Sequence, residues 1–527
     1  MKQLASITSV RSVRWHLVAK GKMNFSEIAA LGLSVSLQPV NLLYAFGGVL
    51  IGTVVGVLPG LGPAATLSLL LPISFQMTPT GAIILLAGIY YGCMYGGSTT
   101  SILINVPGEA ASVVTCLDGY QMALQGRAGP ALGIAAIGSF IAGTVGTLLV
   151  MLVSPLLANV ALRFGPPEFT SLIIMSFMVL TYIVKGSMVK GLMMASIGVF
   201  LSTVGLDPVS GSNRFTYNIL ELMDGIGFPA VIMGLFGISE VLINLEASET
   251  RNILRTKIKN IVPTIKDLKS SVAPIFRGSI LGFFIGIIPG GGTVLASFMS
   301  YGIEKKVSKN PDKFGTGVIE GVAGPEAANN AAAIGHMVPL LSLGIPTSPV
   351  IAILLGALMM HGIDPGPMLM VKHADLFWGV IFSMYVGNVM LLMLNLPLVG
   401  LWVQFLRIPY SMLFPLILLF CLIGAYSIAN SVVDVFIMLL FGVLGYLFRK
   451  TDYEGAPLIL GLVLGSIFEN AFRQSLMLSD GSFLIFFYRP ISLLFIVIAI
   501  ILLVIPIIGW FKKGTSSAQG TSFRMRP

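Results

Sequence analysis

The sequence predicts an all-α membrane protein with about 12 transmembrane helices. Of its 527 residues, 55% are hydrophobic and only 10% are charged, whereas soluble domains have roughly 25% charged residues. The mean hydropathy is +0.93. No Asp, Glu, Lys, Arg or His occurs from Ile28 to Gly108, a stretch long enough for several crossings of about 20 residues each. Lipid is therefore the expected solvent for most of the chain.

Apolar segments separated by polar or basic stretches define the expected helices. They lie near residues 29–58, 80–104, 131–162, 168–185, 187–205, 226–245, 317–345, 347–361, 376–400, 411–429, 430–448, 456–477 and 488–511. The net charge of +9 comes from short basic patches between these segments and at the two ends. This is the pattern of the positive-inside rule and not of a nucleic-acid-binding surface.

Charge and an internal repeat divide the chain. Residues 1–27 are a basic extension, 246–277 a basic linker and 512–527 a basic tail, all expected in the cytoplasm. GTVVGVLPGLG at 52–62 recurs as GFFIGIIPGGG at 282–292, and ILINVPG at 102–108 parallels LSLGIPT at 341–347. The repeat predicts two membrane halves, 28–245 and 278–511, as in many secondary transporters.

The second copy of the repeat predicts a re-entrant hairpin over 278–303. Pro289, Gly290, Gly291 and Gly292 interrupt this uncharged stretch, and a continuous helix would lose about 3 kcal/mol at the proline alone. Each arm of about 11 residues is roughly 16 Å long, half the hydrocarbon thickness. Basic residues on both flanks place the two ends on the cytoplasmic side.

The first copy predicts an equivalent break at Pro59, Gly60 and Gly62. Broken helices persist at membrane depth only where protein or a water-filled path surrounds them. Their exposed N–H groups can bind an anion and their free carbonyls a cation, so both tips are candidate binding sites. The alternative is a pair of kinked spanning helices whose glycines serve close packing.

Polar side chains in apolar surroundings supply the other candidates. Ser98, Thr99, Thr100, Ser101 and Asn105 follow a glycine pair and suit Na⁺ or a carboxylate, although hydroxyls also pack helices. Glu109 is the first charge after Glu27 and is assigned to a membrane interface, with a site as the alternative.

A small-residue segment at 317–349 contains the leading pathway candidates. Glu326, Asn329 and Asn330 are spaced to lie near one helical face, where they would form a cation-facing surface. Hydrogen bonding between helices is the alternative. Pro346 and Thr347 form the turn that parallels the one at 107–108. Glu469 and Arg473 are spaced for an internal, structural ion pair.

Signatures of catalysis are missing from the sequence. There is no HExxH, GxSxG or Walker motif, and the four histidines form no ligand cluster. The three cysteines lack CxxC spacing. The chain is predicted not to be an enzyme, and no cofactor is expected beyond Na⁺ or H⁺ as a coupling ion.

Several long motifs, in order, resemble the large permease subunit of the tripartite tricarboxylate transporters. They are LPGLGPAATLSLLLPISF, NVPGEAASVVTCLDGYQMALQGRAGPALG, PGGGTVLASFMSYGIEKKVSK and GVAGPEAANNAAA. The resemblance extends from about Asn24 to Lys513. Gln121 replaces an expected proline, and Thr347 stands where glycine is common, at a turn that could face the substrate.

The resemblance implies a bacterial inner-membrane permease with an elevator-type fold. It further implies a small membrane subunit of about four helices, a periplasmic substrate-binding protein, and import of tricarboxylates or related carboxylates driven by an ion gradient. A standalone exporter or channel that needs no binding protein is the alternative. A membrane-embedded enzyme is a third reading, disfavoured because no nucleophile and base pairing is evident.

Overall fold

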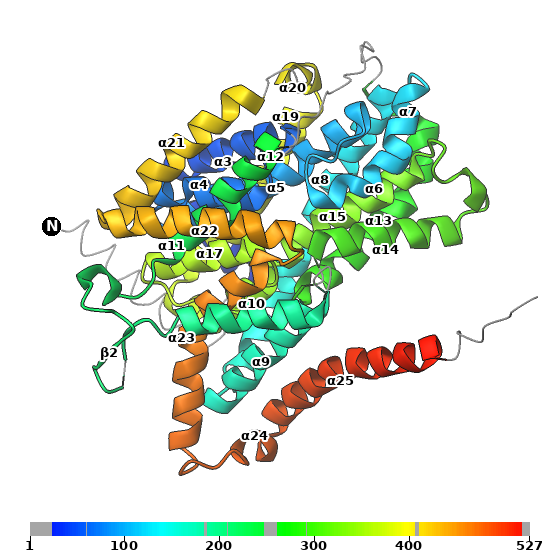
Figure 1. Cartoon of the computed structure of the whole chain (residues 1–527). Helices are drawn as coiled ribbons and strands as arrows, with labels where there is room; N and C mark the ends of the chain where they lie inside the picture. The colour runs from blue at the N-terminus through cyan, green and yellow to red at the C-terminus, as the bar shows by residue number, and fades with distance from the viewer. Residues whose placement is uncertain are drawn as a thin grey trace, which may run out of the picture. The chain divides into compact units, whose positions relative to one another are not determined.

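A computed structural model describes residues 24–58, 61–183, 187–207, 209–246, 261–290, 292–405 and 410–518. The predicted extension at 1–27 therefore lies almost wholly outside the described residues, as do residues 247–260 of the linker predicted at 246–277. The described chain is helical apart from a ladder of two strands with two residues each, which confirms the all-α class (Figure 1). It forms two compact units, residues 1–162 with 226–447 and residues 163–225 with 448–527.

The first unit contains most of the helices. They are α2 (Phe25–Ser36), α3 (Pro39–Val57), α4 (Pro63–Phe75), α5 (Pro79–Ile104), η1 (Ala110–Ser112), α6 (Val113–Thr115), η2 (Cys116–Tyr120), α7 (Gln121–Leu124), α8 (Ala128–Ala161), α11 (Phe228–Ile232), η4 (Met233–Ile238), α12 (Ser239–Glu246), α13 (Ile265–Ile287), α14 (Gly292–Val307), η5 (Pro311–Lys313), α15 (Glu320–Gly335), α16 (Met337–Leu343), α17 (Pro349–Met360), α18 (Leu369–Lys372), α19 (Ala374–Asn395), α20 (Val399–Phe405), α21 (Tyr410–Ala429) and α22 (Val432–Lys450).

Small residues let α3 and α5 pack backbone to backbone. A Cβ added at Gly52 would lie 2.3 Å from the Ile89 carbonyl oxygen, and one at Gly56 would lie 2.5 Å from the Cys93 carbonyl oxygen. Neither position has room for a side chain. This contact gives α5 a rigid partner along its buried length, as small-residue stripes do in other membrane helices.

The α13–α15 pair repeats this packing. Gly282 and Gly286 lie 230 positions after Gly52 and Gly56 in the sequence repeat. A Cβ on Gly282 would meet the Ala328 carbonyl oxygen at 2.2 Å, and one on Gly286 would meet that of Ala332 at 2.3 Å. Both copies of the sequence motif thus place a glycine face against a second helix. The division into two repeated halves stays a prediction, because each compact unit combines residues from both.

Both Pro-Gly segments interrupt the helices, but the second one differs from the predicted hairpin. α13 has 23 residues, so it is long enough to cross a membrane alone and is not a half-length arm. It begins at a capping box formed by Thr264 and Asp267, within the segment predicted to be linker. The Arg277 Nε donates to Glu304 Oε1 at 2.8 Å, which ties α13 to α14.

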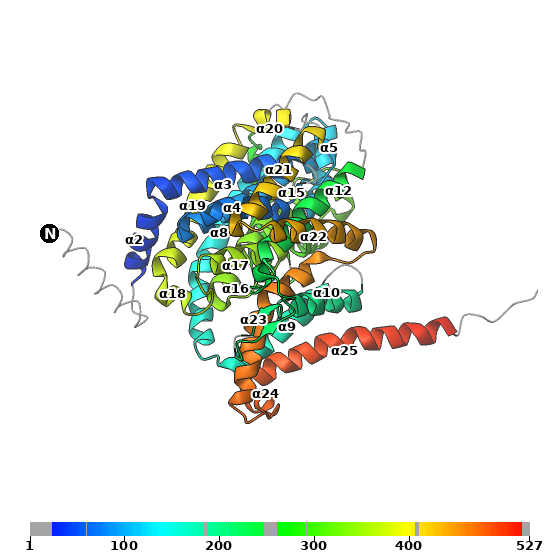
Figure 2. The same cartoon turned by 60° about the vertical axis from the view of Figure 1, so that its left-hand side comes forward.

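Two predicted single helices are also divided. The span at 29–58 breaks before Pro39, which begins α3, and Figure 2 shows α2 and α3 meeting at an angle. The span at 317–345 begins only at Glu320 and breaks at His336, between α15 and α16. A proline lacks the N–H that would continue a helix, which explains the first break.

Within the described residues, eight helices are long and apolar enough to cross a membrane. They are Pro39–Val57, Pro79–Ile104, Ala128–Ala161, Phe228–Glu246, Ile265–Ile287, Ala374–Asn395, Val432–Lys450 and Gly455–Met477. Several shorter apolar helices accompany them. A multi-pass membrane protein is therefore supported, and the predicted total of about 12 crossings stays a prediction.

The second unit contains α9 (Pro166–Ile183), α10 (Met188–Leu201), β1 (Gly205–Leu206), β2 (Asn213–Arg214), η3 (Leu220–Leu222), α23 (Gly455–Met477), α24 (Ile485–Tyr488) and α25 (Pro490–Ala518). β1 and β2 pair antiparallel. α10 and α23 approach closely, since a Cβ on Gly198 would lie 2.0 Å from the Leu458 carbonyl oxygen.

Four charged side chains form a network in this unit. Arg473 contacts Asp207 at 2.9 Å and Glu469 at 2.7 Å, which confirms the predicted Glu469–Arg473 pair. Arg214 contacts Glu469 at 2.7 Å and Asp207 at 3.6 Å. The hydrogen bonds from Arg473 and from the N–H groups of Val209 and Ser210 hold the Asp207 pKa well below its ordinary value.

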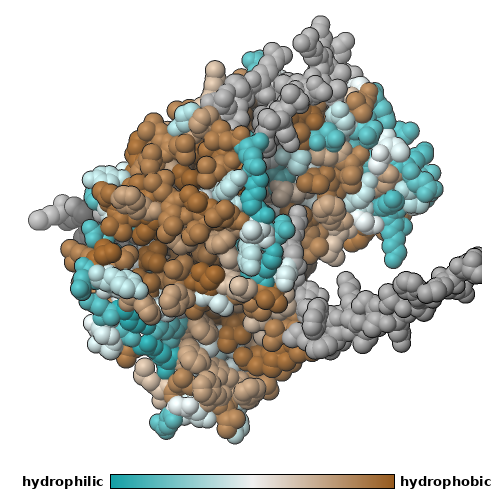
Figure 3. All heavy atoms as spheres, in the orientation of Figure 1, coloured by the Kyte–Doolittle hydropathy of each residue, from teal (hydrophilic) through white to brown (hydrophobic). Residues whose placement is uncertain are grey.

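The molecular surface fits a lipid environment. Large apolar side chains are exposed along α21 and α22, among them Phe420, Ile423, Phe436 and Leu440. Figure 3 shows apolar residues over much of the visible face, and hydrophilic ones at the end of α14 and the segment after it. Exposure of so broad an apolar surface to water is energetically unfavourable, so these helices are suited to contact with lipid or other membrane helices.

Candidate functional site

α15 is buried on all sides, which its composition allows. Every residue from Gly321 to Gly335 is buried, and most are alanine or glycine. Such small side chains let α5, α8, α13 and α14 pack around the helix. The polar residues of α15 are therefore surrounded by protein and not by lipid.

Glu326 extends from α15 between two other segments. Its side chain is 1% exposed. Ser98 of α5 donates to Glu326 Oε2 at 2.5 Å, and the Thr115 hydroxyl of α6 donates to Oε1. Both predicted site segments, around residues 98 and 326, therefore meet at this carboxylate.

Glu109 is the main functional candidate that the sequence analysis did not select. It is 7% exposed, so its side chain is buried inside the protein, while its depth in the membrane stays a prediction. Its Oε2 accepts from the Ala111 N–H at 2.7 Å, and its Oε1 accepts from Asn329 Nδ2 at 3.0 Å. A Cβ on Gly97 would lie 2.8 Å from Glu109 Cγ, so only glycine lets this carboxylate approach α5.

The two asparagines of α15 point to different partners. Asn329 donates to Glu109, whereas Asn330 Nδ2 contacts Ser139 Oγ of α8 at 2.7 Å and its own helix at the Glu326 carbonyl oxygen at 3.0 Å. They do not present one common surface with Glu326. Asn329 Oδ1 is buried and has no hydrogen-bond partner within the described structure.

The remaining polar residues of the 98–105 segment have more local roles. The hydroxyls of Thr100 and Ser101 donate to the Gly97 carbonyl oxygen at 2.9 and 3.0 Å. Asn105 caps the C-terminus of α5 with a left-handed φ of 57°, and its side chain is exposed. These three side chains stabilise the end of α5.

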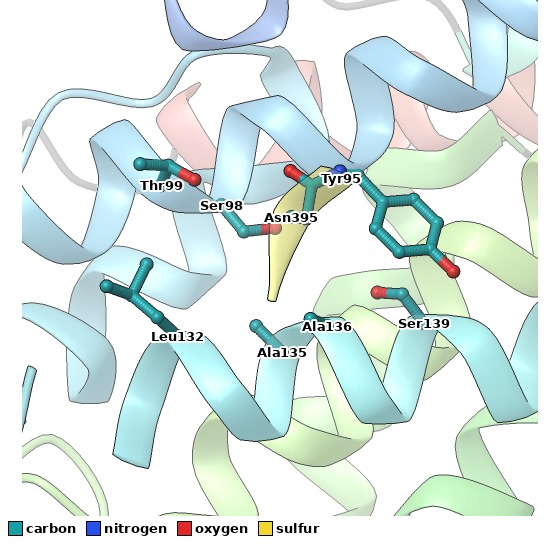
Figure 4. A pocket seen from close by; sticks show the side chains of 8 residues that line it. All are labelled: Tyr95, Ser98, Thr99, Leu132, Ala135, Ala136, Ser139 and Asn395. Carbon is teal, nitrogen blue, oxygen red and sulfur yellow. The ribbon is translucent and has the colours of Figure 1, made fainter. Parts of the chain in front are cut away.

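A small pocket lies between residues of α5, α8 and α19 (Figure 4). It is lined by Tyr95, Ser98 and Thr99 of α5, Leu132, Ala135, Ala136 and Ser139 of α8, and Asn395 of α19. Ser98 thus both lines the pocket and contacts Glu326.

The second Pro-Gly break contacts the turn at 344–348. The Gly290 N–H donates to the Thr347 carbonyl oxygen at 2.9 Å. Pro346 and Thr347 are buried, and the Thr347 hydroxyl has no partner among the described residues. Gly290 and Gly292 have φ values of 74° and 60°, which favour glycine. Pro289 lies in the same turn.

Three predicted tip residues lie outside the described residues, namely Pro59, Gly60 and Gly291. Gly62 is the N-cap of α4. In the part of the chain that the structure describes, no hydrogen bond joins either tip directly to Glu109 or Glu326. The structure therefore shows two polar regions in the first unit, one at the acids and one at the second tip.

Comparison with known proteins identifies the family. The profile of the tripartite tricarboxylate transporter TctA family matches residues 42–460. This match spans most of the chain and contains both Pro-Gly segments and both buried acids. The chain belongs to the TctA family.

Two relatives from Agrobacterium vitis support this assignment. The uncharacterized 52.8 kDa protein in the TAR-I ttuC' 3' region is 48% identical over 486 residues, which cover 92% of this chain and 97% of the relative. An uncharacterized protein in the TAR-II ttuC' 3' region is 52% identical over 211 residues, covering 40% of this chain and 87% of the relative. No solved structure matches the chain.

Membership in the TctA family has direct consequences. The chain is a membrane component of a bacterial tripartite transporter, and such a transporter implies partner subunits. Transport is the activity of this family. The buried polar groups around α15 are thus to be interpreted as parts of a transporter.

Proposed function

We propose that this TctA-family protein is the permease subunit of a secondary transporter in the bacterial inner membrane. It imports tricarboxylates or related small carboxylates that a periplasmic binding protein delivers, works with a small membrane subunit of about four helices, and uses an ion gradient. The observation that carries this proposal is the pair of buried acids, Glu109 and Glu326, inside a membrane protein of a transporter family. Buried ionisable groups are costly in membranes and usually mark ion or substrate paths.

The broken helices support the anion-binding part of the proposal. α14 begins at Gly292, and its first N–H groups carry the positive end of the helix dipole. The contact of Gly290 with the Thr347 backbone brings a second turn beside that end. A carboxylate can bind there through backbone N–H groups without a permanent arginine.

An uptake assay tests the proposal. Proteoliposomes that contain this chain and its small partner are supplied with radiolabelled citrate or other carboxylates, with and without binding protein and with a Na⁺ or a pH gradient. Uptake that requires the binding protein and a gradient is expected. Gradient-independent flux without the binding protein would contradict the proposal and indicate a channel.

The second tip is tested by Gly290→Ala. The positive φ of 74° strains any side chain by about 1–2 kcal/mol, and relief of this strain would move the N–H away from Thr347. Uptake is expected to fall about fivefold or more. Gly126→Ala is the matched control, since Gly126 has a φ of 77° with no neighbour within 4 Å of an added Cβ. Equal uptake by both variants would exclude a role for the tip.

A further inference from the structure

The hydrogen bonds at Glu109 indicate its charge. Both of its oxygens accept from N–H groups, those of Ala111 and of the Asn329 amide. An N–H group can only donate, whereas a protonated carboxyl must itself donate from one oxygen. Two such donors favour the ionised form of Glu109, whereas its burial favours the neutral form. Glu326 is bound by two hydroxyls, from Ser98 and Thr115, which leave room for further oxygen contacts.

No basic side chain balances this charge. Among the described residues, every ion pair of an arginine with an acid involves other carboxylates, such as that of Arg277 with Glu304. His336 contacts the Tyr90 hydroxyl at 2.9 Å and neither of the two acids. An ionised carboxylate that is buried away from water requires a counter-charge.

The other titratable groups close to the two acids do not supply positive charge. They are Tyr90, Cys93 and Tyr95 on α5 and Cys116 on η2, all of them neutral or negative side chains. Asp118 of η2 is already bound by the N–H groups of Gly315, Gly317 and Val318. Either a bound cation or a proton on one of the two acids must therefore offset this charge.

An unused acceptor lies beside Glu109. Asn329 is 1% exposed, and its Oδ1 has no partner although the Nδ2 of the same amide contacts Glu109. Asn329 follows Glu326 by three residues on α15, so it adjoins both carboxylates. A buried amide oxygen without a donor is a ligand for a cation and costs free energy if it stays unpaired.

We infer that Glu109, Glu326 and the Asn329 amide oxygen bind one Na⁺ ion, assisted by the hydroxyls of Ser98 and Thr115. All of these ligands are hard oxygen atoms from α5, α6, the residue before η1 and α15. No group of three His, Cys, Asp or Glu side chains that could hold a metal occurs in the described part of the chain, and two carboxylates with neutral oxygens suit an alkali cation better than a transition metal. This inference rests on the proposed function, because this Na⁺ would be the ion whose gradient drives uptake.

Direct ²²Na⁺ binding to the purified full chain, in choline buffer without carboxylate or partner proteins, tests the site. Wild type is expected to show saturable binding of one Na⁺. Glu109→Gln and Glu326→Gln should each weaken it about tenfold or more, because each removes a charge from the ligand set. Glu221→Gln, at an exposed position, makes the same chemical change and should bind like wild type.

A variant that leaves the charge unchanged still tests the site if the two charge variants do not fold. Asn329→Ala removes the free amide oxygen without altering charge, and a severalfold loss of Na⁺ affinity is expected. Absence of saturable binding by wild type would overturn the inference. Wild-type affinity in all three site variants would do the same.

The uptake assay separates this inference from the proposed function. Carboxylate uptake driven by a pH gradient without Na⁺ would make the proton the coupling ion, overturn the Na⁺ site and leave the proposed function intact. Na⁺ binding as expected, with no carboxylate uptake under any gradient, would support the site and contradict the proposed function.

Discussion

Two clusters of acidic side chains, one in each compact unit, have opposite kinds of partner. In the second unit, Asp207 and Glu469 each contact arginine, so every charge of that network has a partner. In the first unit, Glu109 and Glu326 contact hydroxyls and N–H groups, and neither contacts an arginine or lysine among the described residues. Paired charges stabilise a fold locally, whereas unpaired buried acids can accept and release a cation. The comparison supports a structural role for the Asp207–Glu469 cluster and is consistent with the proposed transport role of Glu109 and Glu326.

The largest expected effect comes from exchanging one acid in each cluster. Glu326→Gln should lower carboxylate uptake by about a hundredfold, since it removes a charge that no other described residue balances. Glu469→Gln should leave uptake within about threefold, because Asp207 still pairs with Arg473 and Arg214 in that variant. The measurement is the initial rate of carboxylate uptake into proteoliposomes, normalised to the amount of reconstituted protein. Equal losses in both variants would remove the distinction between the clusters.

A glycine substitution tests whether Glu109 belongs with Glu326. Gly97→Val places side-chain carbon 2.8 Å or less from Glu109 Cγ and should displace this carboxylate, with uptake reduced about tenfold. Gly302→Val on α14 is the control, because an added Cβ there meets nothing within 4 Å. Wild-type uptake by Gly97→Val would place Glu109 among the structural acids instead.

The smallest expected effect is on the pH dependence of the second unit. The lowered pKa of Asp207, caused first by Arg473, means that its contacts stabilise the fold above the unfolded-state pKa of about 4. This stabilisation is lost progressively as the pH falls below that value. Thermal unfolding between pH 7 and pH 3 should show an additional loss in wild type that Asp207→Asn lacks. Parallel curves for the two proteins would show that the network does not titrate in this way.

Much of the fold follows from local pattern. Long uncharged stretches predict helices because lipid cannot hydrogen-bond an open backbone, and the proline and glycine runs predict the breaks because those residues interrupt helical hydrogen bonding. The length of α13 could not be predicted in this way. Lys266, Asp267 and Lys269 resemble a basic loop in sequence, and only the capping box at Thr264 and the contact of Arg277 with Glu304 extend the helix through them.

The sequence by itself determined the membrane class and the family, and it selected Glu326 as a candidate. An acid within an alanine-rich apolar segment is conspicuous, because burial of a charge in a membrane is so costly. Only the tertiary structure decided which groups surround it. The contacts of Glu326 with Ser98 and of Glu109 with Asn329 join residues more than 200 positions apart. Such contacts form only where two helices pack closely. Close packing requires small residues of both helices to face each other, and no local sequence pattern specifies which helices do so.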